Sequence, residues 1–318
     1  MVAASVNLIP EAPVARMVEL GRFAEELGYG RCWIYDEGLA TRDVYVTLTA
    51  IAQATSTIAL GTGITNPYTR HPATTAATVA TLDELSGGRA FLGIGAGGSL
   101  TLDPLGIERS RPLTAVRDTI AACRGLFSGQ AVTMQGEGFE LRGATLSFAR
   151  PDIEIWLAGR GQKMLALGGA AADGVMLDFI HIDTLGDYVG LVRGAGGRAK
   201  VCYSTMIVTD DEAMADTKPH MTYRLVDSPP QVRAMLGITD HDVATIREAM
   251  ADGLVAAGAH VRDEWVLPFV IAGSVDACAR QLTALVERHS IDEFLLPVLD
   301  LHHAERLMTV VAEVLERA

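Results

Sequence analysis

The chain has 318 residues, of which 49% are hydrophobic and 20% charged, so it is long enough to bury a large core. Its formal net charge of −13 argues against a partner with a phosphate backbone and against an anionic membrane surface. We therefore expect no nucleic acid and no membrane among its partners, and one large domain over residues 1–318.

The cysteines and the N-terminus predict a cytoplasmic protein. The 4 cysteines lie far apart, form no CxxC pair and mostly fall within apolar segments, where a free cysteine behaves as a small hydrophobe. No apolar stretch approaches the roughly 18 residues that a membrane-spanning helix needs, and no basic region precedes an apolar one at the N-terminus. A reducing compartment is the simplest interpretation.

In the first half of the chain, short apolar segments alternate with segments whose apolar residues recur at helical spacing. Apolar runs bounded by glycine or turn residues are typical of strands buried on both faces of a parallel sheet. Pro72 stands where a first helical position belongs. The predicted strands are residues 6–9, 31–35, 58–64 and 90–94, and the predicted helices are 17–27, 44–54, 72–86 and 113–127.

The second half continues this alternation and carries two insertions. Residues 129–150 alternate polar and apolar side chains between glycines, which predicts a small hairpin. Residues 210–264 have a helical pattern that fits no simple repeat. The remaining predicted strands are residues 154–158, 174–177, 201–208 and 294–297, and the remaining predicted helices are 163–172, 274–289 and 307–314.

Short buried strands that alternate with helices, with a helix at the end, favour a closed (β/α)8 TIM barrel with insertions. An open doubly wound sheet is the alternative. In a barrel the loops after the strands carry the chemistry, and they meet on one face. The positions expected on that face are Asn7, Asp36, Thr65, Asn66, residues 95–98, residues 159–161 and Asp178.

The run from Gly93 to Gly98 satisfies the GxGxxG pattern of dinucleotide-binding folds. In those folds a helix begins within the glycines, whereas here the next helical stripe begins near Leu113. The pattern also follows the fourth predicted strand rather than the first. We therefore reject a dinucleotide site.

Asp36 is the candidate catalytic residue. An acid after a strand often caps the next helix, but Asp43 lies closer to that helix and can do so, which leaves Asp36 free. His71 precedes Pro72 at a helix start, so we expect it to bind the backbone there. His181 has no second ligand at metal spacing, and residues 302–303 are expected on the surface of the last helix, so we predict no metal site.

Three long motifs carry a resemblance to a known family. Residues 60–72, 81–90 and 92–97 closely resemble the bacterial-luciferase-like superfamily. Within it they are most similar to the deazaflavin (coenzyme F420)-dependent methylenetetrahydromethanopterin reductases. Residues 158–165 and 172–175 are similar to a second fingerprint of that family.

The resemblance implies where the cofactor binds. A non-prolyl cis peptide in a bulge after the third strand would fall at Gly63 and Ile64 and support the cofactor ring. Asp36, Thr65 and Asn66 would lie near the ring or its side chain, and Gly97 near the ribityl chain. The phosphate would meet the backbone at a helix N-terminus, where N–H groups and the helix dipole favour an anion. The phosphate-site residues would be Gly159, Arg160, Gly161, Lys163 and Met164.

The resemblance implies an oxidoreductase that transfers a hydride between coenzyme F420 and a small organic acceptor, for example a methylene-tetrahydropterin-like compound. It also implies a homodimer. Asn7 and Gly98 stand where the reductases tend to carry acids, so a proton donor is absent at both places. The alternatives are an FMN-dependent monooxygenase or flavin reductase and a non-catalytic cofactor-binding protein. We expect the insertions at 129–150 and 210–264 to select the acceptor.

Overall fold

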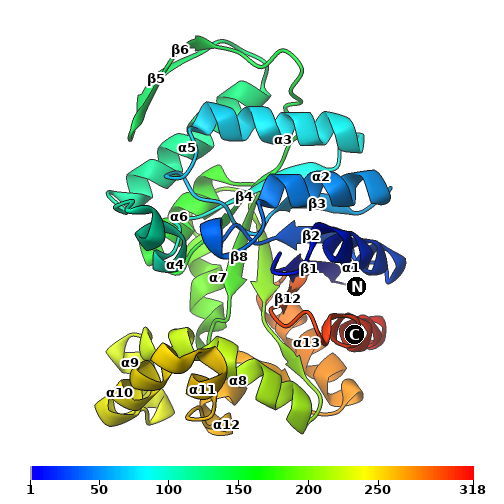
Figure 1. Ribbon diagram of the computed structural model, residues 1–318, viewed down its shortest axis with the longest axis vertical. Helices are drawn as coiled ribbons and strands as arrows, with labels where there is room; N and C mark the ends of the chain where they lie inside the picture. Colours follow the sequence, from blue (N-terminus) through cyan, green and yellow to red (C-terminus); the bar gives the residue numbers. More distant parts are fainter. Residues whose placement is uncertain (1) are drawn as a thin grey trace.

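Within residues 2–318, which the computed structural model describes, eight parallel strands close into a barrel (Figure 1). The predicted TIM barrel is confirmed, and the open sheet is excluded because β1 pairs with both β2 and β12. In their order around the barrel the strands are β1 (Ala3–Leu8), β12 (Glu293–Val298), β9 (Lys200–Ser204), β8 (Gly174–Asp178), β7 (Ile155–Ala158), β4 (Ala90–Ile94), β3 (Ala59–Thr62) and β2 (Arg31–Ile34).

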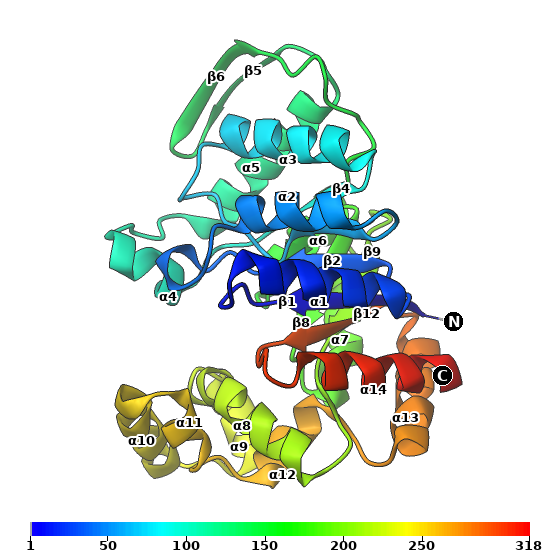
Figure 2. The same ribbon diagram turned by 45° about the vertical axis from the view of Figure 1, so that its right-hand side comes forward.

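Helices surround the barrel and bury their apolar stripes against it (Figure 2). Local signals set several of their ends. Asp43 caps α2 and Pro72 starts α3, while Gly87 ends α3 with a left-handed φ of 72°. The surrounding helices are α1 (Val14–Glu26), α2 (Val44–Ala54), α3 (Pro72–Ser86), α5 (Pro112–Phe127), α6 (Gln162–Ala171), α7 (Leu185–Arg193), α13 (Val275–His289) and α14 (Ala304–Arg317).

The structure differs from the sequence-based expectation at two places. The strand expected over 201–208 ends at Ser204, and β10 (Ile207–Val208) pairs outside the barrel with β11 (Ile271–Ala272). The cause is tertiary, because the Thr205 hydroxyl donates to the carbonyl of Phe269 and turns the chain outward. Helix α7 was not predicted, although it buries Leu185, Val189 and Val192 at helical spacing.

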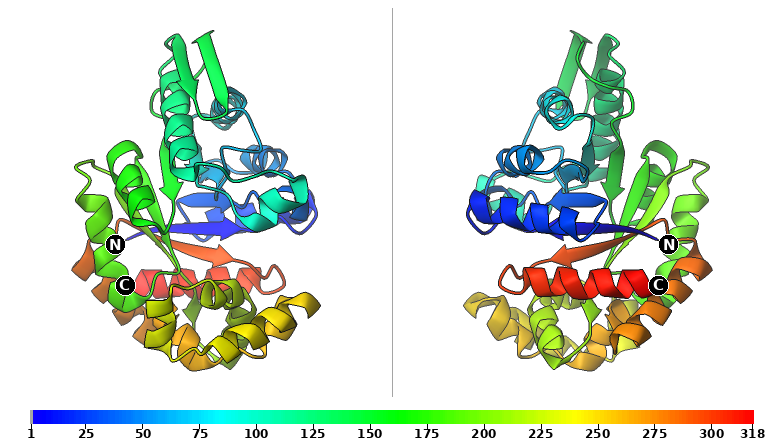
Figure 3. Two further views of the ribbon diagram at one scale, coloured as in Figure 1. Left: turned by 90° about the vertical axis from the view of Figure 1, so that its left-hand side faces the viewer. Right: turned by 90° about the vertical axis from the view of Figure 1, so that its right-hand side faces the viewer.

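The two insertions extend from opposite ends of the molecule (Figures 1 and 3). The predicted hairpin consists of β5 (Val132–Gly136) and β6 (Phe139–Ala144) and lies against α5. The segment 210–264 is helical as predicted, and its buried side chains form a hydrophobic cluster of their own. Its helices are α8 (Asp211–Val226), α9 (Pro230–Leu236), α10 (Asp240–Ala249), α11 (Leu254–Gly258) and α12 (Asp263–Val266).

Large side chains fill the inside of the barrel. The ring of Trp33 lies 4.5 Å from that of Phe91 and 5.6 Å from that of Trp156, both edge to face. All three rings are buried. The barrel therefore has a packed interior, and a ligand can reach only its mouth.

Arg31 closes the amino-terminal end of the barrel. Its guanidinium lies 4.8 Å from the ring centre of Trp156 and 5.2 Å from that of Phe91. It also forms ion pairs of 2.7 Å with Glu154 and 3.0 Å with Glu293. The charges at this end are thus paired with one another.

Candidate functional site

The chain kinks after β3, where the peptide bond between Gly63 and Ile64 is cis. This is the position that the family resemblance implied. The side-chain amide of Asn7, near the end of β1, donates to the carbonyl of Gly63 at 2.8 Å. A Cβ atom at position 63 would lie 2.6 Å from Oδ1 of Asn7 and 2.7 Å from Cβ of Trp33, so a side chain would clash here.

Gly93 in β4 and Gly95 directly after it make room for Ile64 and the neighbouring backbone. A Cβ atom on Gly95 would lie 2.1 Å from Cδ1 of Ile64 and 2.9 Å from the carbonyl oxygen of Ala158. A Cβ atom on Gly93 would lie 2.0 Å from the carbonyl oxygen of Thr62. These glycines therefore serve strand packing, which supports the rejection of a dinucleotide fingerprint.

Asp36 and Thr65 are in direct contact at the ends of β2 and β3. The hydroxyl of Thr65 donates to Oδ2 of Asp36 at 2.6 Å. Asp43 accepts the N–H groups of Tyr45 and Val46 at the start of α2, so Asp36 is free of the capping role, as predicted. Burial raises the pKa of the Asp36 carboxyl, although the Thr65 hydrogen bond and a nearby arginine act in the opposite direction. Asp36 is thus a half-buried carboxyl group that keeps its proton to higher pH than an ordinary aspartate.

A second buried acid, Glu37, follows directly and was not proposed from the sequence. Its Oε2 accepts the hydroxyl proton of Thr101 at 2.8 Å. Burial raises the pKa of this carboxyl too. Thr101 belongs to α4 (Ser99–Leu102), a short helix that begins directly after the glycines, earlier than the predicted start near residue 113. The sequence does place two adjacent acids directly after a predicted strand, and this pattern could have pointed to Glu37.

Asn66 and Gly97 also lie together. Oδ1 of Asn66 accepts the backbone N–H groups of Tyr68 and Thr69 at 2.9 and 3.0 Å, which fixes the loop after the bulge. Gly97 has a φ of 71°, and a Cβ atom there would lie 3.1 Å from Cβ of Asn66. Arg109 donates to the carbonyl of Gly97 at 2.9 Å.

The second group of predicted residues surrounds the start of α6. Gly161 precedes this helix with extended backbone, and no side chain caps the first N–H groups. A Cβ atom on Gly161 would meet nothing within 4 Å, whereas one on Gly159 would lie 2.6 Å from Cγ of Met164. Lys163 is exposed beside this opening. The arrangement can accept an anion at an uncapped helix start.

Arg160 and Arg224 add positive charge near the same end of the barrel. Arg160 lies 3.4 Å from Oδ2 of Asp178, whose Oδ1 accepts the hydroxyl proton of Ser204 at 2.9 Å. Arg224 comes from α8 and donates to the carbonyl of Phe179. Burial, and then the charge of Arg160, lower the pKa of the Arg224 guanidinium to about 10. No local pattern in the sequence points to Arg224, because it lies in the distant insertion.

The two groups of site residues meet at Gly95, which touches both Ile64 and the end of β7. Within the described chain, several buried polar atoms at or near this end lack a hydrogen-bond partner. Among them are Oδ1 of Asn7, Nε1 of Trp33, Nε of Arg224 and the hydroxyls of Tyr45 and Tyr203. Such atoms are uncommon in a closed core, so the barrel mouth keeps polar groups available for a ligand.

The histidines discussed above act on the backbone or on other segments. Nδ1 of His71 accepts the N–H of Ala73 at 3.2 Å, as predicted. His181 accepts the N–H of Asp183 at 3.2 Å in the same way. Residues 302–303 precede the last helix rather than lying on it, and His303 is partly buried against α8, so their predicted surface position is wrong in part.

Comparisons with known proteins agree with this geometry. The sequence model of the luciferase-like monooxygenase family matches residues 2–292. The chain is 35% identical to the 5,10-methylenetetrahydromethanopterin reductase of Methanolobus tindarius over 89% of its own length and 90% of the relative's. It is 32% identical to the enzyme of the same name from Archaeoglobus fulgidus, over 88% and 89% of the two chains.

A solved structure is similar over nearly the whole chain. The coenzyme F420 dependent tetrahydromethanopterin reductase of Methanopyrus kandleri superposes with a TM-score of 0.87 at 27% identity. The match covers 98% of this chain and 97% of that one. In residues 2–318, no helix has the length and apolar character needed to cross a membrane.

Proposed function

The chain belongs to the luciferase-like monooxygenase family, and from that premise we propose that it is a coenzyme F420-dependent oxidoreductase. The reaction is hydride transfer between the coenzyme and a small organic acceptor of the methylene-tetrahydropterin class. Three similar relatives carry the name of that reductase over about nine tenths of the chain. The names of these relatives support the proposed reaction, and the geometry of the barrel mouth supports the proposed position of the coenzyme.

The fit of the coenzyme rests on two features of the mouth. At one side, Gly63 and Ile64 form the bulge on which the ring would rest, with Asp36, Thr65 and Asn66 beside it and Gly97 along the ribityl chain. At the other side, an anion would meet free N–H groups. The residues that would hold the phosphate are Gly159, Arg160, Gly161, Lys163 and Met164, although the N–H of Met164 already donates to the carbonyl of Gly161 at 2.9 Å.

The single observation that carries this assignment is the uncapped start of α6, with open space at Gly161 and basic side chains at Arg160 and Lys163. The protein has a net charge of −13, so a local positive site is unusual in it. A phosphate satisfies the free N–H groups and the helix dipole together.

When bound, the coenzyme supplies the hydride chemistry, and the chain supplies orientation and proton control. Asp36 is the proposed catalytic residue, because burial favours the protonated form and Thr65 fixes Oδ2 of its carboxyl. Asn7 cannot donate a carboxyl proton, and its amide is occupied by the carbonyl of Gly63. Asp36, next to Glu37, would therefore hold the proton that acids provide elsewhere in the related reductases.

The alternative is an FMN-dependent monooxygenase or flavin reductase, which the family's description favours. A turnover assay separates the two functions. Purified protein is mixed with methylene-tetrahydropterin and either reduced coenzyme F420 or reduced FMN, and cofactor oxidation is followed without oxygen. We expect oxidation of coenzyme F420 that depends on the pterin. Pterin-dependent oxidation of FMN but not of coenzyme F420, or turnover with FMN alone in a parallel assay open to oxygen, would contradict the proposal.

The same proposal includes a single domain over residues 1–318, a homodimer and a cytoplasmic location. The family resemblance supports the dimer, which light scattering on the purified protein tests. The cysteines Cys32, Cys123, Cys202 and Cys278 are buried and unpaired, which supports a reducing compartment.

A further inference from the structure

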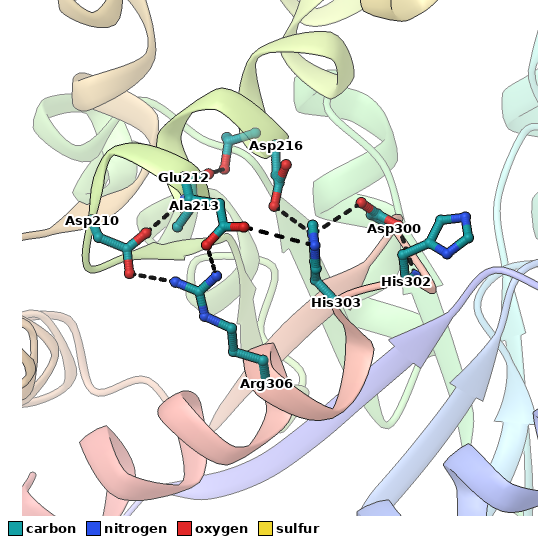
Figure 4. Close-up of polar contacts among 9 residues, drawn as sticks. Asp210, Glu212, Ala213, Asp216, Asp300, His302, His303 and Arg306 are labelled. Atoms are coloured by element: carbon teal, nitrogen blue, oxygen red, sulfur yellow. Dashed lines mark hydrogen bonds and ion pairs between the residues drawn. The ribbon is translucent and has the colours of Figure 1, made fainter.

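A cluster of metal-ligating side chains joins the helical insertion to the barrel (Figure 4). Asp216 lies on α8, whereas Asp300 and His303 lie in the loop between β12 and α14. One ligand atom from each residue lies within 4.8 Å of the others. Nδ1 of His303 is 2.8 Å from Oδ2 of Asp216 and 3.4 Å from Oδ2 of Asp300.

These separations suit a small divalent cation. Zinc binds histidine nitrogen and carboxylate oxygen at about 2.0–2.2 Å, so in a tetrahedral site the ligand atoms lie roughly 3.3–3.6 Å apart. The histidine nitrogen lies 3.4 Å from the Asp300 oxygen, within that range, and 2.8 Å from the Asp216 oxygen, about half an ångström below it. The three ligand atoms lie within 4.8 Å of one another, so binding a cation requires the carboxylates to rearrange around the ring nitrogen.

Hydrogen bonding within the cluster does not satisfy both carboxylates. Nδ1 of His303 can carry only one hydrogen, and Asp216 is in position to receive it. Oδ2 of Asp300 then faces the same ring nitrogen without a donor of its own, since the N–H of His302 goes to Oδ1. A cation would accept a lone pair from all three residues.

No other cation serves these two acids in the described part of the chain. Asp216 and Asp300 form ion pairs there only with His303. The nearest arginine in the cluster, Arg306, is held by Asp210 at 2.6 Å and by Glu212. The two carboxylates therefore share the imidazole of His303 at ion-pair distance, and His220 is a second imidazole close enough to interact with both.

The surroundings supply an outer carboxylate and an entry path. Oε1 of Glu212 lies 3.9 Å from Nε2 of His303, on the side of the ring away from the cluster. A carboxylate hydrogen-bonded to the other ring nitrogen commonly supports a metal-bound histidine, and Glu212, whose Oε2 is held by Arg306, lies at ion-pair distance from that nitrogen. Asp216 and Asp300 also line an open cavity of about 790 Å³ together with His220, one helical turn after Asp216.

We propose that Asp216, Asp300 and His303 bind one divalent cation of the zinc class, which fastens α8 to the loop after β12. Histidine nitrogen with two carboxylate oxygens suits zinc better than magnesium, which prefers oxygen ligands and water. The cavity side of the site remains open for water or His220. Such an ion would hold the helical insertion in a fixed position over the barrel mouth.

The test is a zinc titration of the full-length protein after treatment with a chelator, followed by calorimetry and by thermal unfolding. We expect one zinc ion per chain and a rise of the melting temperature on binding, because the ion binds the folded state. Magnesium at the same concentration should produce neither effect. No cofactor is needed, so the result is independent of the proposed enzyme activity.

Two variants and one control locate the site. Asp300→Asn keeps the acceptor for the N–H of His302, so it should fold, and His303→Gln removes the imidazole. Each should weaken zinc binding by about tenfold or more and abolish the zinc-dependent rise in melting temperature. The matched control is His241→Gln, an exposed histidine on α10, which should bind zinc as the unchanged protein does.

The proposal is overturned if the unchanged protein binds no zinc at one equivalent, or if the Asp300 and His303 variants bind it with undiminished affinity. Binding of magnesium in preference to zinc would overturn the assignment of the cation class.

Discussion

The two ends of the barrel use charged residues in opposite ways. At the amino-terminal end, Arg31 pairs with Glu154 and Glu293 and stacks between aromatic rings. At the carboxyl end, the carboxyl group of Asp36 accepts the hydroxyl proton of Thr65 and has no ion pair within the described residues, and no side chain caps the start of α6. One end satisfies its polar groups internally, and the other leaves them free for a ligand. In TIM barrels this division separates stability from function.

The carboxyl groups of Glu154 and Asp36 show the difference most directly. Burial pushes the pKa of both upward. For Glu154, the charge of Arg31 and the contacts with Lys200 and Trp156 more than offset burial, so the pKa lies below its ordinary value. For Asp36 the opposing interactions are weaker and the pKa is raised. The presence of an oppositely charged partner, rather than the depth of burial, decides whether the pKa is lowered or raised.

The largest effect should come from removing the cation at the amino-terminal end. Arg31→Met leaves the side chain of Glu293, which is 4% exposed, without its partner and should lower the free energy of unfolding by about 3–5 kcal/mol. Urea denaturation measures the change. The affinity of the folded variant for coenzyme F420 should not change.

The control for Arg31 is Arg16→Met, which breaks a surface pair with Glu305. It should lower the free energy of unfolding by no more than about 1 kcal/mol. If the two substitutions lowered the free energy of unfolding equally, the Arg31 network would contribute no more to stability than a surface ion pair does.

At the mouth, Asp36→Asn should lower turnover by about a hundredfold or more and yet stabilise the fold. A carboxyl whose pKa is raised by folding binds its proton more tightly in the folded state, so its ionisation at neutral pH weakens folding. The asparagine can still accept the Thr65 hydrogen bond. Melting temperatures should be higher for the variant at pH 7, and the difference should shrink as the pH falls toward 4, near the ordinary aspartate pKa.

A variant less stable than the unchanged protein at pH 7, or one with full turnover, would show that Asp36 is a structural residue. The pH series separates these outcomes from a general loss of folding.

Gly161→Asp should separate binding from stability at the start of α6. The aspartate would cap the helix and raise the free energy of unfolding by roughly a few tenths of a kcal/mol, because glycine is already tolerated at this position. It would also put a negative charge where the phosphate is expected, so affinity for coenzyme F420 should fall by about tenfold or more. Fluorescence titration of the coenzyme measures the affinity.

Gly161→Ala is the matched control, because a Cβ atom meets nothing within 4 Å there and φ is −80°. It should bind the coenzyme as the unchanged protein does. If the aspartate variant also kept full affinity, the phosphate would have to bind elsewhere.

Apart from the Arg16 control, the smallest loss in the free energy of unfolding is expected at Glu25, which contacts the residues directly before β3 at the amino-terminal end of the barrel. Its carboxylate accepts the backbone N–H groups of Ser56, Thr57 and Ile58, and these bonds outweigh burial and lower the pKa to about 2. The stabilisation is present above the ordinary glutamate pKa and is lost as the pH falls through 2.

The Glu25 side chain is half-buried and reaches solvent, so Glu25→Gln should lower the free energy of unfolding at pH 7 by only about 1 kcal/mol. The difference from the unchanged protein should vanish in acid. A difference as large at pH 2 as at pH 7 would rule out the carboxylate as its source.

Much of the fold could be predicted, because the signals are local. Pro72, Gly87 and Asp43 mark helix ends, and apolar runs such as 90–94 mark strands, and the structure agrees at each. The split of residues 201–208 depends on the contact between Thr205 and Phe269, which no local pattern encodes. Helix α7 was missed because Gly186 and Gly190 weaken a short apolar stripe.

The site could be predicted only where long motifs occur. The bulge at Gly63 and the glycines before α6 lie within such motifs. Arg224 and Asp216 come from the helical insertion and reach their partners only through the tertiary fold. Residue spacing alone therefore could not reveal the cluster of Asp216, Asp300 and His303, nor the role of Arg224 beside Phe179.

The most direct measurement is a crystal structure of the protein with bound coenzyme F420. We expect the ring against Gly63 and Ile64 at the carboxyl end of the barrel, and the phosphate within hydrogen-bond distance of the first N–H groups of α6. A coenzyme bound elsewhere, or a phosphate distant from Gly161, would contradict the division of the barrel into a stabilising end and a ligand-binding end.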